Sequence, residues 1–192
     1  MARPRGPGER AGLDTDQVLA AARDVLRDSG VSGLSLRAVA RRLGVAPNAI
    51  YSHVGSRDEL LDAVLDDVLA EVRLPFAGEV ARDPLGAVRA IMLASYDVLL
   101  RHPGLMPSYL DRQGSRGVQA QQLGVVTLEA LGRAGLTEPA AREAMRVLIV
   151  NTIGFAAFSA RPTGSPPGVM SAVELRANFL RGLDWLLDGI AR

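Results

Sequence analysis

The chain has 192 residues, 48% of them hydrophobic and 22% charged, with 22 basic and 21 acidic side chains and no cysteine. This composition is enough to form a packed core, and it excludes collagen-like, disordered and disulfide-stapled classes and any thiolate chemistry. We expect a cytoplasmic protein, because we find neither a run of roughly 20 apolar residues, which a membrane helix needs, nor an N-terminal secretion signal.

Charge is distributed unevenly along the chain. Residues 1–53 carry 8 arginines against 5 acidic residues, whereas residues 54–192 carry 14 arginines against 16. Residues 1–12 alternate Pro and Gly around three arginines, so we predict a disordered basic arm there. The front of the chain is therefore slightly basic, which by itself is weak evidence for nucleic-acid binding.

The front of the chain carries the pattern of three short helices. Apolar residues recur at three- and four-residue spacing, which is typical of helices that bury one face. Asp14 or Thr15 can cap the first helix, and Gly30 can end it. Ser35 and Gly44 can do the same for the second helix. The predicted spans are 17–30, 36–44 and 47–54.

A fourth helix is predicted to connect this front part to the rest of the chain. Ser56 can cap it, and Asp58 and Glu59 fall in its first turn, where the helix dipole favours negative charge. Leucines and valines at helical spacing follow, as expected for a helix with one buried face. We predict this connecting helix over residues 56–72.

The rest of the chain is also predicted to be helical. Its apolar segments are separated by short stretches rich in helix breakers, and none shows the two-residue alternation of a half-buried strand. We therefore predict an all-α fold of about nine helices. The rear helices are predicted over 84–101, 103–111, 115–134, 138–160 and 171–190.

Residues 33–65, GLSLRAVARRLGVAPNAIYSHVGSRDELLDAVL, resemble the N-terminal helix-turn-helix of the TetR family of transcriptional regulators. The total length and the number of predicted helices also fit that family. The resemblance implies a DNA-binding domain in 13–55 and a domain for ligand binding and dimerisation in 56–192, connected through the helix 56–72. It is carried by Gly33-Leu34-Ser35, Ala40, Leu43-Gly44-Val45, Ile50-Tyr51, His53 and the helix start from Arg57 to Leu61.

The function implied by this resemblance is ligand-responsive control of transcription. Members of the family are most commonly repressors that bind palindromic double-stranded DNA as homodimers, and a small hydrophobic effector releases them. A dimer is also expected on physical grounds, because a single helix-turn-helix contacts too few bases and phosphates for useful specificity.

The third predicted helix has the slim first turns that are needed to enter the major groove, which is roughly 12 Å wide. Asn48 is suited to the edge of an adenine, and Ala49 to a thymine methyl group. Asn48 can equally cap or stabilise its own turn, and this alternative remains open. Ile50 and Val54 are four residues apart and should face inward. The small or hydrogen-bonding residues of this segment are Pro47, Asn48, Ala49 and Ser52.

Other side chains of the front part are suited to the DNA backbone. Tyr51 and His53 each have a polar tip on an apolar body, and the equivalent positions in the family commonly contact phosphate. Ser35 and Arg57 lie at helix N-termini, where they can hold the backbone from two sides. Arg37 is predicted to reach a base, with guanine the usual choice. The alternative for His53 is a hydrogen bond to the adjacent turn.

The last two long helices are predicted to form the dimer interface. Residues 147–160 of the helix 138–160 are apolar almost all round, and together with the closing helix and their symmetry mates they can form a four-helix bundle. The alternative is that both helices only complete the core of one chain. The closing helix offers Leu175, Phe179, Leu183, Leu186 and Leu187.

The resemblance also implies an effector cavity in the rear domain. Adaptable apolar side chains mixed with a few polar groups are the usual lining of such a cavity, although the same residues are often plain core. The candidate lining residues are Met92, Tyr96, Met106, Tyr109, Met145, Asn151, Thr152 and Phe155.

Two other classes of function compete with this interpretation. We find no Gly-rich phosphate loop, no G-x-S-x-G, no HExxH and no Cys/His cluster, so we expect no enzyme, no cofactor and no metal. A helical small-molecule-binding protein without DNA affinity is the stronger rival. DNA binding that weakens steeply as salt rises distinguishes the regulator from both.

Overall fold

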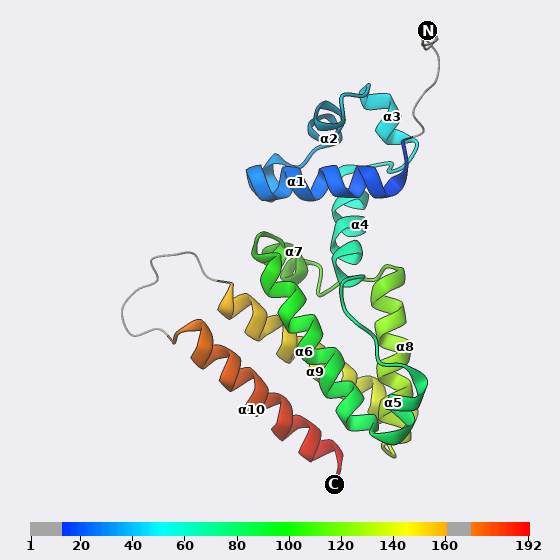
Figure 1. Cartoon of the computed structure of the whole chain (residues 1–192), viewed down its shortest axis with the longest axis vertical. Helices are drawn as coiled ribbons and strands as arrows, with labels where there is room; N and C mark the ends of the chain where they lie inside the picture. The colour runs from blue at the N-terminus through cyan, green and yellow to red at the C-terminus, as the bar shows by residue number, and fades with distance from the viewer. Residues whose placement is uncertain (1–12, 161–169) are drawn as a thin grey trace, which may run out of the picture. The chain divides into compact units, whose positions relative to one another are not determined.

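The computed structural model describes residues 13–160 and 170–192. These two ranges contain ten α-helices, one 3-10 helix and no strand, which confirms the all-α prediction. The predicted disordered arm, residues 1–12, lies outside the described residues. Figure 1 labels the α-helices; the elements are α1 (Thr15–Gly33), α2 (Leu36–Leu43), α3 (Pro47–Tyr51), α4 (Arg57–Leu69), α5 (Ala77–Arg82), α6 (Pro84–Arg101), η1 (Pro103–Leu105), α7 (Met106–Asp111), α8 (Val118–Arg133), α9 (Glu138–Ser159) and α10 (Ala172–Ile190).

The chain consists of two compact units, an N-terminal unit, Met1–Val64, and a C-terminal unit, Leu65–Arg192. The division lies inside α4, whose first turns carry the buried side chains of Leu60, Leu61 and Val64. These side chains explain why the start of α4 packs with the N-terminal unit, although the sequence grouped it with the rear of the chain.

The first helix begins and bends at residues that the sequence singles out. Asp14, rather than Thr15, caps α1: its side chain accepts a hydrogen bond from the Gln17 amide at 2.7 Å, and its own amide donates to the Gln17 side chain at 3.2 Å. This reciprocal pair is a capping box. Gly30 has a φ of 65°, so the regular helix breaks there, and one further turn extends α1 to Gly33.

Backbone hydrogen bonds fix the turn between α2 and α3. The Ser35 hydroxyl oxygen accepts from the Ala38 amide at 3.1 Å and caps α2, as predicted. At the other end Gly44 is left-handed, with a φ of 67°, and the Val45 amide donates to the Ala40 carbonyl at 3.0 Å. This is a Schellman arrangement, which closes a helix and redirects the chain.

The third helix is shorter than its predicted span of 47–54. It has five residues, Pro47–Tyr51. The amides of His53 and Val54 both donate to the Ile50 carbonyl, at 2.9 and 3.0 Å, and this tight turn ends the helix. Ile50 and Val54 are buried, so their predicted inward orientation is confirmed.

The C-terminal unit is a bundle built around α6 and α9. These two helices pack on each other, and both α8 and α10 pack on the pair (Figure 1). The short helix α5 is missing from the sequence-based prediction, because six residues are too few for a periodic pattern. Among the described residues, none of the helices combines the length and the apolar character that a bilayer crossing requires.

The apolar stripe of α10 faces the core of its own chain. Leu175, Phe179, Leu183 and Leu187 are buried, and the Phe179 ring stacks on Tyr96 of α6 with a centroid distance of 4.3 Å. These four side chains therefore cannot provide the dimer contact for which the sequence singled them out. Apolar residues at helical spacing show which face of a helix is buried. They do not show whether its own chain or a partner chain buries that face.

Candidate nucleic-acid interface and ligand pocket

The short helix α3 presents a polar outer face. Pro47, Asn48 and Tyr51 are exposed, and the Tyr51 side chain is 55% accessible, whereas Ile50, between them on the inner face, is fully buried. No hydrogen-bond partner within the described ranges holds the side chains of Asn48 and Tyr51. Their polar groups are therefore available to a partner molecule, which is what recognition of a base edge requires.

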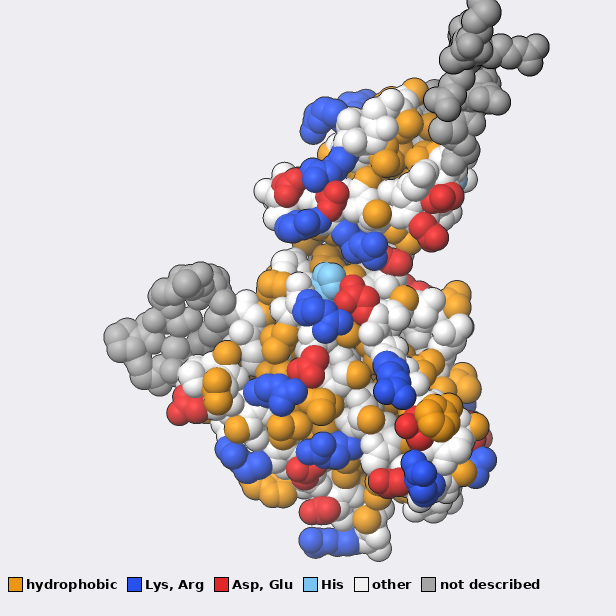
Figure 2. Space-filling model, in the orientation of Figure 1, with side chains coloured by type: hydrophobic (Ala, Val, Ile, Leu, Met, Phe, Trp, Pro, Cys, Tyr) orange, Lys and Arg blue, Asp and Glu red, His pale blue; other side chains and the backbone are white. Residues whose placement is uncertain are grey.

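Two arginines of α2 add unneutralised positive charge to this unit. Arg37 and Arg41 are exposed, lie one helical turn apart and have no acidic partner in the described part of the chain. Like charges at this spacing repel each other, so a polyanion would relieve an unfavourable contact. Arg42 differs, because it pairs with Asp24 at 3.2 Å and with Asp28 at 2.5 Å. Figure 2 shows basic side chains over the part of this unit that holds α2.

Other residues predicted to contact DNA are already engaged inside the unit. The Ser52 hydroxyl donates to the Ala49 carbonyl at 2.8 Å, and the Ser35 oxygen caps α2. His53 is half-buried, with its Nδ1 atom 3.4 Å from the Thr15 hydroxyl. The His53 ring thus contacts the start of α1, whereas the alternative expected from the sequence was a hydrogen bond to the adjacent turn.

The side chain of Arg57 has a structural contact that the sequence did not predict. Its guanidinium donates from Nε to the Leu34 carbonyl at 2.9 Å and from Nη2 to the Val31 carbonyl at 2.7 Å. Both carbonyls lie at the C-terminal end of α1, where helix carbonyls lack intrahelical partners. Arg57 therefore ties the start of α4 to the end of α1.

Replacing Arg57 with glutamine should destabilise the N-terminal unit. The variant loses two charge-assisted hydrogen bonds to helix-end carbonyls, and because the guanidinium is partly exposed we expect a loss of about 1–2 kcal/mol in the free energy of unfolding. Urea unfolding followed by circular dichroism measures this free energy. Arg41→Gln, at an exposed and unpaired position, is the control and should change stability by less than about 0.5 kcal/mol. Equal stability of the two variants would refute the structural role of Arg57.

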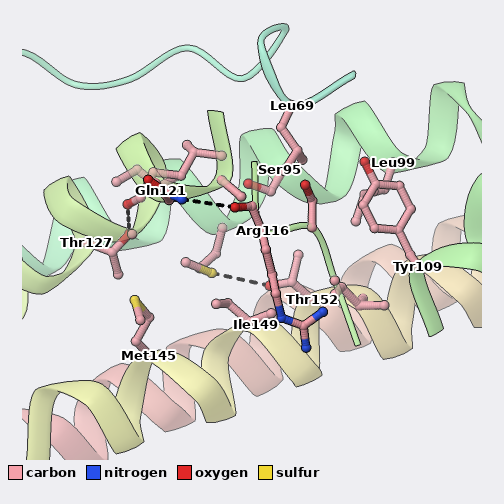
Figure 3. A pocket seen from close by; sticks show the side chains of 18 of the residues that line it. Leu69, Ser95, Leu99, Tyr109, Arg116, Gln121, Thr127, Met145, Ile149 and Thr152 are labelled. Atoms are coloured by element: carbon pink, nitrogen blue, oxygen red, sulfur yellow. Dashed lines mark hydrogen bonds between the residues drawn. The ribbon is translucent and has the colours of Figure 1, made fainter. Parts of the chain in front are cut away.

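A pocket of about 400 Å³ opens in the C-terminal unit between α6, α8 and α9. Apolar side chains form most of its wall, and the segment before α8 forms its edge (Figure 3). The lining residues are Leu69, Ile91, Met92, Ser95, Leu99, Tyr109, Gln113, Gly114, Ser115, Arg116, Ala120, Gln121, Leu123, Gly124, Thr127, Met145, Ile149, Thr152 and Ile153.

The structure brings half of the predicted ligand residues to this pocket. The Thr152 hydroxyl donates to the Leu148 carbonyl at 2.8 Å and has the Met92 sulfur 3.4 Å away. The wall residues among the candidates are Met92, Tyr109, Met145 and Thr152. Those placed elsewhere are Tyr96, Met106, Asn151 and Phe155.

Two of the candidates outside the pocket, Tyr96 and Met106, are buried in the core, and Asn151 and Phe155 are half-buried. Tyr96 stacks on Phe179, and its hydroxyl lies 2.9 Å from the Ser159 hydroxyl, while the Phe155 ring meets Phe179 at 5.9 Å. The helix α10 thus covers the side of α6 and α9 that faces away from the pocket. A Met or aromatic residue in the sequence does not reveal which side of its helix will be covered.

Two contacts join the pocket wall to α4. The Tyr109 hydroxyl donates to the Leu65 carbonyl, and burial of this phenol, with smaller effects from Asp66 and other nearby acids, raises the pKa of Tyr109 well above its usual value. The Asp66 carboxylate accepts from the Ser115 hydroxyl and from the amides of Gln119 and Ala120, each at 3.0 Å. It therefore caps the N-terminus of α8 from another helix.

Gly117 makes the approach of Asp66 possible. A Cβ atom at Gly117 would lie 2.2 Å from the Asp66 carboxylate carbon, so any larger residue would push α4 and the start of α8 apart. The sequence offered no signal for this contact, because the two residues are far apart in the chain and neither belongs to a motif.

Comparison with known proteins identifies the N-terminal unit. A family model described as "Bacterial regulatory proteins, tetR family" matches residues 18–64. An HTH-type transcriptional regulator of Saccharopolyspora erythraea is 40% identical over 92 residues, which are 47% of this chain and 38% of that protein. The class D tetracycline repressor protein of Escherichia coli is 38% identical over 72 residues, 36% of this chain and 33% of that protein. The matched region thus spans less than two fifths of the length of these relatives.

Similarity to solved structures extends over both units. A crystal structure of BioQ with its double-stranded DNA operator is 27% identical, with a TM-score of 0.70 over 93% of this chain and 98% of that chain. A variant of TetR from Acinetobacter baumannii AYE in complex with minocycline is 25% identical, with a TM-score of 0.77 over 92% of this chain and 96% of that chain. Residues 18–64 thus match the bacterial regulatory proteins of the tetR family, and the fold of the two helical units is similar to that of BioQ and of TetR.

Proposed function

We propose that this chain is a ligand-responsive repressor that binds palindromic operator DNA as a homodimer and is released by a small hydrophobic effector. The observation that carries the proposal is the outer face of α3, with exposed Asn48 and Tyr51, together with the exposed and unpaired Arg37 and Arg41 of α2, on which α3 packs. A surface of this kind serves no purpose in packing. It suits a partner that combines base edges with phosphates.

The roles within this interface follow from side-chain chemistry. Asn48 is assigned to an adenine edge and Ala49 to a thymine methyl group, while Tyr51 and Arg41 are assigned to phosphates and Arg37 to a guanine or a phosphate. The related BioQ structure contains its DNA operator, which supports a DNA partner for this chain.

The proposed dimer uses the outer surface of α9 and α10. Val147, Val150 and Phe158 are exposed along one stripe of α9, and Trp185 on α10 is 73% accessible. Exposed aromatic and branched side chains on two adjacent long helices are costly in water and typical of a homodimer interface. Two copies of the α9–α10 pair can meet as a four-helix bundle. The resulting two-fold dimer matches the two-fold symmetry of a palindromic operator.

Release by the effector is assigned to α4. This helix is held in the N-terminal unit by Arg57 and in the C-terminal unit by Tyr109 and Asp66. An effector in the pocket touches Tyr109 and the segment before α8, so it can favour one arrangement of α4 over another. Only such a difference in effector affinity between two states can change DNA affinity. The complex of the related TetR variant with minocycline supports a small-molecule partner.

A mobility-shift assay with labelled DNA tests the proposal. The purified chain should retain a fragment from the region upstream of its own gene, and the affinity should fall by orders of magnitude between about 50 and 200 mM salt, as expected when several arginines neutralise phosphates. A chain that retains no genomic fragment at low salt is not a regulator. The rival function, a helical small-molecule-binding protein without DNA affinity, would then be the better account.

A further inference from the structure

The chemical character of the pocket wall restricts the ligands that it accepts. Most of the wall is apolar, and Arg116 is the one charged residue among those that line it. Arg116 is an exposed residue that also lines the pocket, and an apolar cavity with a single cation at its wall is complementary to a molecule with an apolar body and one negative charge.

Hydroxyl groups deeper in the pocket are already occupied. The Thr127 hydroxyl donates to the Leu123 carbonyl at 2.7 Å, and the Thr152 hydroxyl donates to the Leu148 carbonyl. The Tyr109 hydroxyl donates to the Leu65 carbonyl of α4. These three groups have spent their only proton within the protein, so the uncharged side-chain donors that remain on the wall belong to Ser95, Gln113 and Gln121.

Arg116, by contrast, keeps most of its donors free. Its Nη1 atom donates to the Arg112 carbonyl at 2.9 Å, and no carboxylate in the described part of the chain pairs with it. In Figure 3 its side chain extends across the pocket toward Ile149 and Thr152. The Gln121 side chain donates to the Arg116 backbone carbonyl at 3.1 Å, which holds the residue in place at the start of α8.

The acidic side chain that contacts this segment, Asp66, is occupied by other donors. Asp66 accepts three hydrogen bonds, one from Ser115 and two from amides at the N-terminus of α8, whose dipole it also meets. A guanidinium with several free donors is suited to a two-point bond with a carboxylate.

We propose that the effector is an apolar carboxylate: its carboxylate binds the Arg116 guanidinium, and its hydrocarbon or aromatic body fills the space between Met92, Leu123 and Met145. This inference rests on the proposed function, because that function makes the bound molecule an effector. The binding itself does not require DNA. Arg116 thus selects the class of ligand, and the apolar wall selects its size.

Calorimetric titration of the full chain with matched probes tests this inference. Decanoate, decanol and decylamine share one hydrocarbon body and differ in charge, and 2-naphthoate with 2-naphthol tests an aromatic body. At least one carboxylate should bind roughly tenfold or more tightly than its neutral match, the equivalent of about 1.4 kcal/mol. Arg116→Gln should remove that advantage and leave decanol or 2-naphthol binding unchanged. Arg133→Gln, which removes an exposed charge from the other end of α8, should preserve it.

The inference is overturned if neither carboxylate binds, if the amine binds best, or if Arg116→Gln leaves the carboxylate advantage intact. Its failure is distinguishable from failure of the proposed function. A chain that binds operator DNA but prefers neutral probes is a regulator of another ligand class. If the chain binds a carboxylate through Arg116 but retains no DNA, the ligand class proposed for this pocket stands and the proposed regulatory function fails.

Discussion

Replacing both Asn48 and Tyr51 with alanine should abolish specific operator binding while the fold stays intact. A good side-chain contact to a base contributes about 1–3 kcal/mol of discrimination, so the loss of Asn48 should weaken specific binding roughly 10- to 100-fold, and the loss of the Tyr51 phosphate contact should weaken binding to all sequences. Neither side chain has a hydrogen-bond partner within the described ranges, and Tyr51 is 55% exposed, so the helix content and melting temperature should not change. A titrated mobility shift and circular dichroism measure the two effects.

The matched comparison for this variant is Arg37→Ala on the neighbouring helix. If Arg37 meets phosphate, its loss weakens binding to all sequences alike and lowers the salt slope by about one. If it meets a base, the loss relaxes the preference at one position of the operator instead. Unchanged operator affinity in the Asn48/Tyr51 double variant would refute the role assigned to the outer face of α3.

Replacing Val150 with arginine should convert the dimer to a monomer. Val150 lies on α9 and is 71% exposed in the single chain, at the centre of the stripe that includes Val147 and Phe158. In a symmetric interface the change places two charges in an apolar contact, and an unpaired buried charge costs several kcal/mol. Specific DNA affinity should fall with the dimer, because each monomer has only one reading helix.

Sedimentation velocity of the wild type and variants at several concentrations measures this effect. Val125→Arg is the matched control, since Val125 is 65% exposed on α8, away from the proposed interface. It should remain a dimer and bind the operator. A dimer that survives Val150→Arg but not Val125→Arg would transfer the interface to α8.

Much of the N-terminal unit was predictable because local residues decide its geometry. Ser35 caps α2 and Gly44 takes the left-handed conformation that ends it, and both signals are visible in a short stretch of sequence. The spacing of apolar residues in the local sequence likewise predicted which face of α10 is buried. The sequence did not reveal that this face packs on α6 and α9 of the same chain.

The remaining features depend on contacts between distant residues. Arg57 reads as a helix-start cation suited to phosphate, yet it binds carbonyls that lie 23 and 26 positions earlier in the chain. Arg116 falls at the start of the predicted helix 115–134 but precedes α8, and only the packing of α8 against α6 and α9 turns it toward a pocket. Motifs therefore predicted a candidate interface, while tertiary packing decided which of its side chains remain exposed.

Hydroxyl-radical footprinting of the wild-type protein on the DNA upstream of its own gene tests the central claim most directly. Two copies of the α2–α3 surface should protect two symmetric half-sites whose centres lie about one helical turn, roughly 34–36 Å, or a multiple of it apart. The half-sites should read as an inverted repeat. A single protected segment, or two segments without that symmetry, would contradict operator recognition by a two-fold dimer.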